Sequence, residues 1–330
     1  MDHSFNFIAI GDIVTDAFIR LKDPAAHIDI DRNVREICMR FADKVPYEEV
    51  YVVPAVGNSA NAAVSAARLG LDAALVSNVG DDYFGKECLD ALAVNKVSTL
   101  FVKINIGFKT NYHYVLWYDA DRTILVKHEE FPYELPDIGN PTWMYLSSLG
   151  HHSLSFHKKI EAYLTLHPAS KLAFQPGTFQ MKLGMEELGY FYKRADIFFC
   201  NKEEAQRILK TGEKNIGNLL RMMADLGPKI TVITDGPSGA YAYDGVSAWS
   251  IRSYPDIKPP FERTGAGDAF SSTVTAALAL GLDLKEALRW GPINAMSVVQ
   301  QVGAQASLLS RSELETYLAK APEDYWPKPL

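Results

Sequence analysis

The stretch RTGAGDAF, residues 263–270, decides how this chain of 330 residues is interpreted. An apolar run of small and β-branched residues follows it, from Ser271 to Leu280, and predicts a buried helix. Gly265 and Gly267 let the turn before that helix bring backbone N–H groups close to a ligand. The helix N-terminus adds a partial positive charge at the same place. The stretch therefore predicts an anion-binding site.

Asp268 lies inside this predicted site, where a carboxylate repels a phosphate unless it takes part in the chemistry. In one interpretation Asp268 is the base of a phosphoryl transfer. In the other it is only a first-turn residue that the helix dipole favours. The stretch is not a P-loop, because Asp268 and Ala269 replace the Lys and Ser/Thr, and Phe270 breaks a dinucleotide fingerprint. On these residues alone both interpretations stay open.

The composition excludes several classes of protein. Hydrophobic residues make up 48% of the chain and charged residues 22%, so a sizeable core is expected. The net charge of -7, without any Lys/Arg-rich run, argues against a nucleic-acid-binding protein. The three cysteines form no CxxC pair, which favours reduced thiols and a cytoplasmic location. Neither a signal peptide nor a membrane span is expected.

Strand-like and helix-like segments alternate over most of the chain. A strand-like run from Phe5 to Gly11 comes first, and the alternation resumes after Pro141 and continues to Ile230–Thr234. This pattern predicts a mainly parallel sheet covered by helices on both faces, a three-layer α/β/α fold. We expect residues 1–330 to form a single domain.

A smaller sheet is expected beside this domain. Between Thr99 and Phe131 apolar residues recur at every second position, as in a strand. The pattern of a β-hairpin is formed there by Asn111–Tyr118 and Arg122–Lys127. The two segments at about residues 12–55 and 99–131 are predicted to form a lid over the strand ends, a device that excludes water from a site.

The first lid segment does not continue the α/β alternation. From Leu21 to Val53 it combines a charged loop, a helix-like stretch at Val34–Phe41 and a strand-like stretch at Val50–Val53. We expect it to project from the main sheet.

Polar residues follow several of the predicted strands, at the edge where open α/β sheets bind ligands. Asp12 and Asp16 follow the first strand. Asn201 and Glu204 have the spacing of a helix capping box, and they also suit phosphate and Mg²⁺ contacts. Both roles are compatible.

Two further features each allow two interpretations. The sequence TDGPSG, residues 234–239, suits either a tight turn or a loop that contacts a nucleotide phosphate or ribose. Asn294 lies among small apolar residues, so it serves either core hydrogen bonding or a nucleotide pocket.

On these motifs the chain resembles the ribokinase-like (PfkB) family of sugar and nucleoside kinases. TGAGDAF at 264–270 resembles the C-terminal signature of the family, and VGNSANAA at 56–63 with Arg68–Gly70 resembles the N-terminal one. The resemblance covers nearly the whole chain. It implies the ribokinase-like fold, ATP as phosphoryl donor and Mg²⁺ as cofactor.

The resemblance also implies residue roles. Asp268 would accept the proton of the substrate hydroxyl, and the backbone N–H groups of Gly265, Ala266 and Gly267 would form an anion hole. The implied substrate-binding residues are Asp16, Gly57, Asn58, Asn61 and Asn111. The implied nucleotide-binding residues are Asn201, Thr234, Gly236, Gly239, Thr264 and Asn294, and Glu204 is the implied magnesium position.

Two positions depart from the family pattern. Val56 replaces the first of two glycines in the N-terminal signature, so the substrate pocket is expected to differ in shape. Glu262 stands where the family often has the Asp that sets monovalent-cation activation, which argues against dependence on potassium (K⁺).

The expected acceptor is a primary hydroxyl of a ribose-like sugar or of a nucleoside. The alternatives are a hexose, sugar-acid or sugar-phosphate kinase of the fructokinase or 2-keto-3-deoxygluconate kinase type, and a non-catalytic sugar or nucleotide sensor. A phosphorylated sugar becomes a candidate if several cationic and polar lid residues face inward. The alternative is that these residues form a solvated face of the hairpin. These residues are Lys109, Asn111, His113, Arg122 and Lys127.

The hairpin also bears on assembly. Its outer face is expected to be apolar, because Tyr112, Tyr114, Leu116 and Tyr118 alternate with the inward residues. Two lids would then pair into a homodimer, as in many relatives.

Overall fold

The main sheet forms the middle layer of the protein, whose computed structural model describes residues 5–22, 26–31, 34–119 and 121–330. Within these residues the sheet has 10 strands. In spatial order the strands are β16 (Lys328–Pro329), β15 (Ala248–Ile251), β14 (Ala240–Tyr243), β13 (Thr231–Thr234), β12 (Ile197–Asn201), β11 (Lys171–Phe174), β10 (Trp143–Leu146), β1 (Phe7–Ile10), β6 (Ala73–Gly80) and β7 (Val102–Asn105). In this order the strands from β13 to β7 run parallel, and β14, β15 and β16 add an antiparallel edge.

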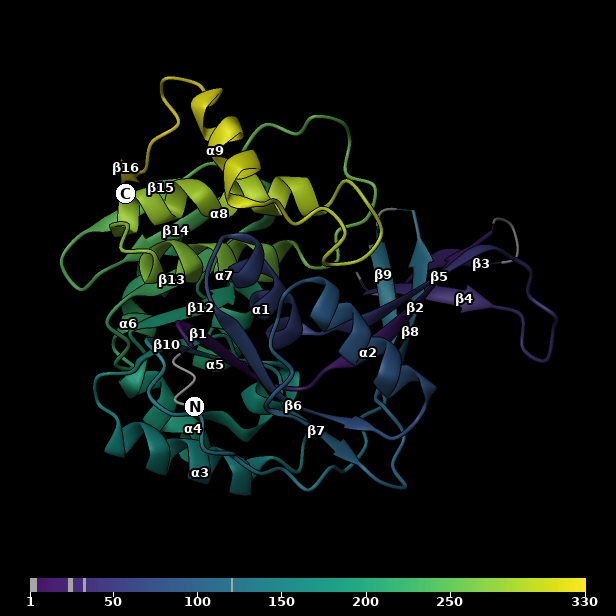
Figure 1. The fold of residues 1–330 in the computed structure, drawn as a ribbon. Helices are drawn as coiled ribbons and strands as arrows, with labels where there is room; N and C mark the ends of the chain where they lie inside the picture. The colour runs from purple at the N-terminus through teal and green to yellow at the C-terminus, as the bar shows by residue number, and fades with distance from the viewer. Residues whose placement is uncertain (1–4, 23–25, 32–33, 120) are drawn as a thin grey trace.

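Helices cover both faces of this sheet (Figure 1). Side chains of β1 alternate between the two faces, with Phe7 and Ala9 in one core and Ile8 and Ile10 in the other. The first face carries α1 (Asn58–Arg68), α2 (Tyr83–Val94), α7 (Ala266–Ala279), α8 (Leu284–Val298) and α9 (Arg311–Ala319). The second face carries α3 (Leu154–Leu166), α4 (Thr178–Arg194), α5 (Lys202–Leu209) and α6 (Ile216–Ala224). The predicted three-layer α/β/α fold is therefore confirmed. None of the described helices is long and apolar enough to cross a membrane.

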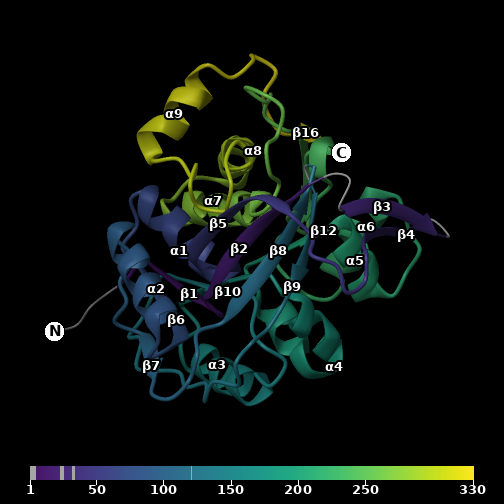
Figure 2. The same cartoon turned by 90° about the vertical axis from the view of Figure 1, so that its right-hand side faces the viewer.

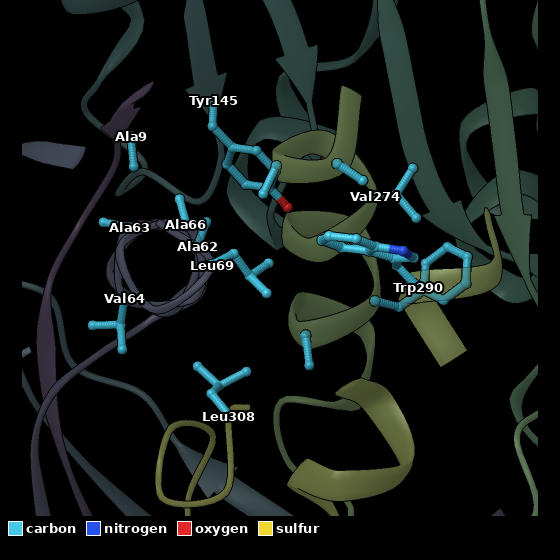
Figure 3. Packing of buried hydrophobic residues seen from close by; sticks show 14 of the residues in the cluster. Ala9, Ala62, Ala63, Val64, Ala66, Leu69, Tyr145, Val274, Trp290 and Leu308 are labelled. Atoms are coloured by element: carbon cyan, nitrogen blue, oxygen red, sulfur yellow. The ribbon is translucent and has the colours of Figure 1, made fainter. Parts of the chain in front are cut away.

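Helix α1 packs closely against α7. Ala62 and Ala66 of α1 are fully buried and lie on the side of the helix that faces α7 (Figure 3). Ser65 Oγ lies 3.4 Å from Thr273 Oγ1 across the same contact. Small side chains let the two helix backbones approach, and a larger residue would have to be accommodated by movement of the backbone. The contact sets the spacing of the two helices.

A separate four-stranded sheet contains most of the predicted lid and faces the viewer in Figure 2. Its strands, in spatial order, are β5 (Tyr47–Val56), β2 (Val14–Leu21), β8 (Tyr112–Tyr118) and β9 (Asp121–Leu125). The predicted hairpin corresponds to β8 and β9. Strands β2 and β8 run parallel, with Asp16 opposite His113. The parallel pairing joins two segments that lie far apart in the sequence.

One expected helix is a strand. The stretch Val34–Phe41 contains β4 (Val34–Met39), which pairs antiparallel with β3 (Ala26–Asp31) as a two-stranded sheet. Residues 23–25 and 32–33 of the first lid segment lie outside the described residues. Ile37 pairs with Ile28 of the neighbouring strand. Pairing of this kind stabilises a strand, and the spacing of apolar residues within the segment alone does not predict it.

Candidate active site

A cavity of about 610 Å³ lies between the lid and the edge of the main sheet. The walls are formed by strands β12 and β13, by Gln175 after β11, by the first turns of α4 and α7, and by the lid. The cavity brings together most of the predicted site residues. These are Asp16, Gly57, Asn58, Asn61, Asn201, Glu204, Thr234, Thr264, Gly265, Ala266, Gly267 and Asp268.

Four predicted site residues do not line the cavity: Asn111, Gly236, Gly239 and Asn294. Asn111 is buried and donates to the Ile13 carbonyl (3.1 Å), while its own oxygen accepts from Glu129 N (2.7 Å). Asn294 is also buried, donating to Thr273 Oγ1 (2.8 Å) and accepting from Leu309 N (2.9 Å). Both amides thus serve internal hydrogen bonds.

Gly265 is the N-cap residue of helix α7 and has a conformation that requires glycine. Its φ of 83° lies in the left-handed region, and a Cβ added there would lie 2.3 Å from the Cβ of Ala304. A Cβ on Gly267, in contrast, would meet no atom within 4 Å. The first N–H groups of a helix lack intrahelical acceptors, so this turn offers donors and a positive dipole end to an anion in the cavity.

Asp268 lies in the same first turn and is held by two side-chain amides. Asn61 Nδ2 donates to Asp268 Oδ2 (2.8 Å), and Gln175 Nε2 donates to Asp268 Oδ1 (3.1 Å). Burial raises the pKa of Asp268, whereas the two amide hydrogen bonds and the Arg122 charge lower it. The resulting carboxylate faces the cavity beside the anion-binding turn.

Gln175 was not predicted as a site residue. It immediately follows β11, the strand that ends beside β10 and β12 at the carboxyl edge of the sheet. That position, a polar residue directly after a strand, is the signal by which Asn201 and Thr234 were selected. The same sequence signal could therefore have identified Gln175 as a candidate site residue.

Two carboxylates on the lid side of the cavity are each paired with a histidine. Asp12 is buried and accepts from Tyr133 Oη (2.8 Å) and Gly150 N (2.8 Å), and its Oδ2 lies 3.0 Å from His128 Nδ1. Asp16 Oδ1 lies 3.4 Å from His113 Nδ1. These residues provide a polar wall for hydroxyl groups.

The imidazoles of His113 and His128 lie side by side, with ring centroids 5.2 Å apart. Within the described residues, the buried His113 Nε2 has no hydrogen-bond partner. His128 was not predicted, although it continues the alternation of Arg122, Ile124 and Val126, which all line the cavity. A substrate group can satisfy the open nitrogen of His113.

Asn201 and Glu204 form the predicted capping box at the start of α5. Asn201 Oδ1 accepts from Glu204 N (2.8 Å), and Glu204 Oε2 accepts from Asn201 N (2.8 Å). Both side chains also line the cavity, so the cap and a ligand role are compatible. Burial raises the pKa of Glu204 above its usual range, which a nearby cation would counteract.

The described residues contain no group of three or more His, Cys, Asp or Glu side chains suited to hold a metal ion. Magnesium in phosphoryl-transfer sites typically has one or two protein carboxylates, with phosphates and waters completing its shell. Glu204, a carboxylate on the cavity wall, meets that requirement. The residues present therefore fit Mg²⁺ bound together with a nucleotide.

Glu262 is fully buried just before the glycine turn. Its Oε1 accepts from the N–H (2.8 Å) and hydroxyl (2.6 Å) of Thr264. Its Oε2 has no hydrogen-bond partner in the part of the chain that the structure describes. An unpaired buried carboxylate oxygen is costly, and a cation would satisfy it.

Comparison with known proteins agrees with this geometry. The profile of the pfkB family carbohydrate kinases matches residues 25–311. Ribokinase of Mus musculus is 28% identical over 276 residues, covering 78% of this chain and 82% of its own. Cytidine kinase of Thermococcus kodakarensis is 29% identical over 259 residues, covering 75% and 88%. The structure of Arabidopsis thaliana ribokinase complexed with ribose and ATP has a TM-score of 0.78 at 19% identity, covering 96% of this chain and 99% of its own.

The family profile covers most of the chain, and the solved structure shares its fold over nearly all of it. The resemblance drawn from the two signatures is confirmed, and the chain is a kinase. It belongs to the pfkB family of carbohydrate kinases.

Proposed function

We propose that this kinase transfers the γ-phosphoryl group of ATP to a primary hydroxyl of a ribose-like sugar or a nucleoside, with Asp268 as general base. The observation that carries the proposal is the position of Asp268, whose carboxylate is held by Asn61 and Gln175 in the turn that also offers an anion site. A carboxylate at this place would repel a bound phosphate, and general-base catalysis gives it a chemical role there.

In the proposed reaction, Asp268 takes the proton of the acceptor hydroxyl. The hydroxyl oxygen forms a bond to the γ-phosphorus, the bond from that phosphorus to the β,γ-bridging oxygen breaks, and ADP leaves. The turn at Gly265–Gly267 stabilises the charge on the transferring group. Mg²⁺ held near Glu204 would neutralise phosphate charge when bound.

The acceptor side supports a polyhydroxylated substrate. Asp16, Asn58 and His113 line the cavity wall on the lid side and at the start of α1. Carboxylate, amide and imidazole groups are the partners that sugar hydroxyls need for specific binding. The relatives named ribokinase and cytidine kinase are consistent with a ribose-containing acceptor.

A second candidate is a kinase of a sugar phosphate or sugar acid, as Arg122 and Lys182 suggest. Both line the cavity, and neither forms an ion pair with any described residue. Of the five lid residues considered for such a role, His113 and Arg122 face the cavity. Lys109 is exposed outside it, and Lys127 pairs with Glu129 at 2.6 Å.

Release of ADP with a panel of acceptors tests the proposal. The panel contains ribose, ribonucleosides, fructose, aldonic acids and the corresponding sugar phosphates, each with ATP and Mg²⁺. Turnover that is highest with a neutral ribose-containing acceptor supports the first candidate, and preference for an anionic sugar supports the second. No ADP release above the Asp268→Ala background with any acceptor contradicts the kinase proposal. Binding of a sugar or nucleotide without turnover would then indicate the sensor alternative.

We also propose that two lids pair into a homodimer. The outer face of the lid carries apolar side chains that remain about half exposed, Val52 (52%), Tyr114 (48%) and Leu125 (52%). Apolar residues grouped on one sheet face favour burial against a partner. Light scattering should give the mass of a dimer for the native chain and of a monomer for Tyr114→Asp. A monomeric native chain at micromolar concentration contradicts the proposal.

A monovalent cation is proposed beside Glu262, although replacement of the family's Asp by Glu suggested otherwise. The unpaired Oε2 is the observation that supports it. A cation there would lie next to Thr264, which immediately precedes the anion-binding turn.

A further inference from the structure

A chain of polar side chains runs from the main sheet to the proposed base. Tyr145 on β10 is fully buried, and its hydroxyl donates to Gln175 Oε1 (2.5 Å). Gln175 in turn donates to Asp268 Oδ1 (3.1 Å). The Tyr145 hydroxyl oxygen also lies 2.9 Å from Ser271 Oγ, one helical turn after the base.

The second oxygen of Asp268 has an equivalent support from the other side. Asn61 donates to Asp268 Oδ2 (2.8 Å), and Gln305 Nε2 donates to Asn61 Oδ1 (2.9 Å). Gln305 is itself fixed by donating to the Ala55 carbonyl (2.6 Å). Each amide that contacts the base is therefore held by a further donor behind it.

The direction of these hydrogen bonds follows from the chemistry of the groups. An ionised carboxylate only accepts, so the NH₂ groups of Asn61 and Gln175 must face Asp268 and their carbonyl oxygens must face away. Those oxygens then require donors, which Tyr145 and Gln305 supply. Burial and the Asp268 charge raise the pKa of Tyr145 well above its usual range, so its hydroxyl stays a donor.

We propose that Tyr145 and Gln175 are positioning residues for the reaction: together with Asn61 and Gln305 they keep the Asp268 carboxylate ionised and oriented. Two of its roughly four lone-pair sites are occupied, leaving others for the acceptor hydroxyl. The inference rests on the proposed role of Asp268 as base. If Asp268 were protonated, its O–H would point at an amide N–H, and two donors cannot form a hydrogen bond. The amide donors of Asn61 and Gln175 therefore favour the ionised form of Asp268.

The test compares Tyr145→Phe with Tyr325→Phe. Tyr325 is also fully buried, and its hydroxyl donates to the Arg289 carbonyl (3.0 Å), far from the cavity. Both variants lose one buried hydroxyl. Only Tyr145→Phe is expected to move the acid limb of the kcat/KM profile to higher pH and to lower kcat/KM by about 2–10-fold. The KM for ATP should not change in either.

Gln175→Leu is the second variant, chosen because Gln175 is only partly buried and tolerates substitution better than Tyr145. It removes the donor itself, so kcat/KM should fall by about 10–100-fold. Gln175→Glu places a second carboxylate beside Asp268 and should move the acid limb further to higher pH.

A readout without turnover separates this inference from the proposed function. The ¹³C signal of the Asp268 carboxyl, assigned by its loss in Asp268→Asn, is titrated in the native chain, in Tyr145→Phe and in Gln175→Leu. A midpoint that rises in both variants supports the inference even if no acceptor is phosphorylated. Unchanged midpoints, or equal effects of Tyr145→Phe and Tyr325→Phe on the pH profile, overturn it while leaving Asp268 as base.

Discussion

Replacing Gly265 by alanine is expected to lower the melting temperature of the protein, whereas the same change at Gly267 is not. At Gly265 the backbone has a φ of 83°, and the new methyl carbon would lie 2.3 Å from the Cβ of Ala304. At Gly267 the methyl would meet no atom within 4 Å and would stand at the cavity wall. We therefore expect the fold to require glycine at position 265, and the proposed ligand to require it at position 267.

The size of the effect follows from two costs at Gly265. A left-handed conformation costs a non-glycine residue about 1–2 kcal/mol. Overpacking against Ala304 adds about 1–3 kcal/mol. An unfolding entropy of about 2.1 cal/mol/K per residue corresponds to about 0.7 kcal/mol/K for 330 residues. The melting temperature of Gly265→Ala should therefore fall by about 3–7 °C.

For Gly267→Ala, the melting temperature should stay within about 1 °C of the native value because alanine suits the first turn of a helix. Turnover should fall by about 10²-fold, the typical loss when one part of an anion hole is impaired. Differential scanning fluorimetry and steady-state ADP release measure the two effects on the same preparations.

The reasoning fails if Gly265→Ala melts at the native temperature, since the close contact with Ala304 would then carry no cost. It also fails if Gly267→Ala turns over at the native rate, since the turn would then not contact the phosphoryl group. A loss of stability in Gly267→Ala equal to that in Gly265→Ala would contradict the assignment of separate roles.

Further predictions concern the charged groups in the cavity and the buried Glu262 beside the glycine turn. Asp268→Ala should lower kcat by about 10²–10⁴-fold with little change in KM, as measured by ADP release with the best acceptor. Asp268 must be ionised to accept a proton, and burial raises its pKa above the ordinary value of an aspartate. A pH–rate profile should therefore show kcat/KM declining as the pH falls through this raised pKa. Arg122→Met removes a charge that lowers the pKa of Asp268, so the acid limb of the same profile should move to higher pH. If Glu262 binds a monovalent cation, activity should rise when potassium chloride replaces tetramethylammonium chloride, and Glu262→Gln should abolish that rise.

The layered fold could be predicted from local pattern because its strands are short apolar runs separated by helices. The strands Phe7–Ile10 and Ala73–Gly80 are buried at every position, which is what a sheet covered on both faces requires. The segment Val34–Phe41 was misassigned because a two-stranded ribbon depends on its partner strand, which the residues of one segment do not specify.

The candidate site was only partly predictable for a related reason. Residues in the glycine turn are identified by their own sequence, so Gly265 and Asp268 were found directly. Gln175 and His128 obtain their roles from contacts with Asp268 and Asp12, which lie far away along the chain. Asn111 immediately precedes β8 of the lid, but its amide is used by backbone groups. The position of a residue at the end of a strand therefore predicts that it lies near the site, while its hydrogen-bond partners determine which role it has there.

The close contact of α1 with α7 has a consequence for catalysis. Asn61 belongs to α1 and Asp268 to α7, so the 2.8 Å hydrogen bond between their side chains depends on the spacing of these two helices. Ala62 and Ala66 lie in the core on the side of α1 that faces α7 (Figure 3), and neither lines the cavity. If Asp268 is the base, a methyl group added to either alanine should separate the Asn61 amide from it and slow the reaction even in a protein that still folds. The size of these alanines is thus constrained by chemistry as well as by packing.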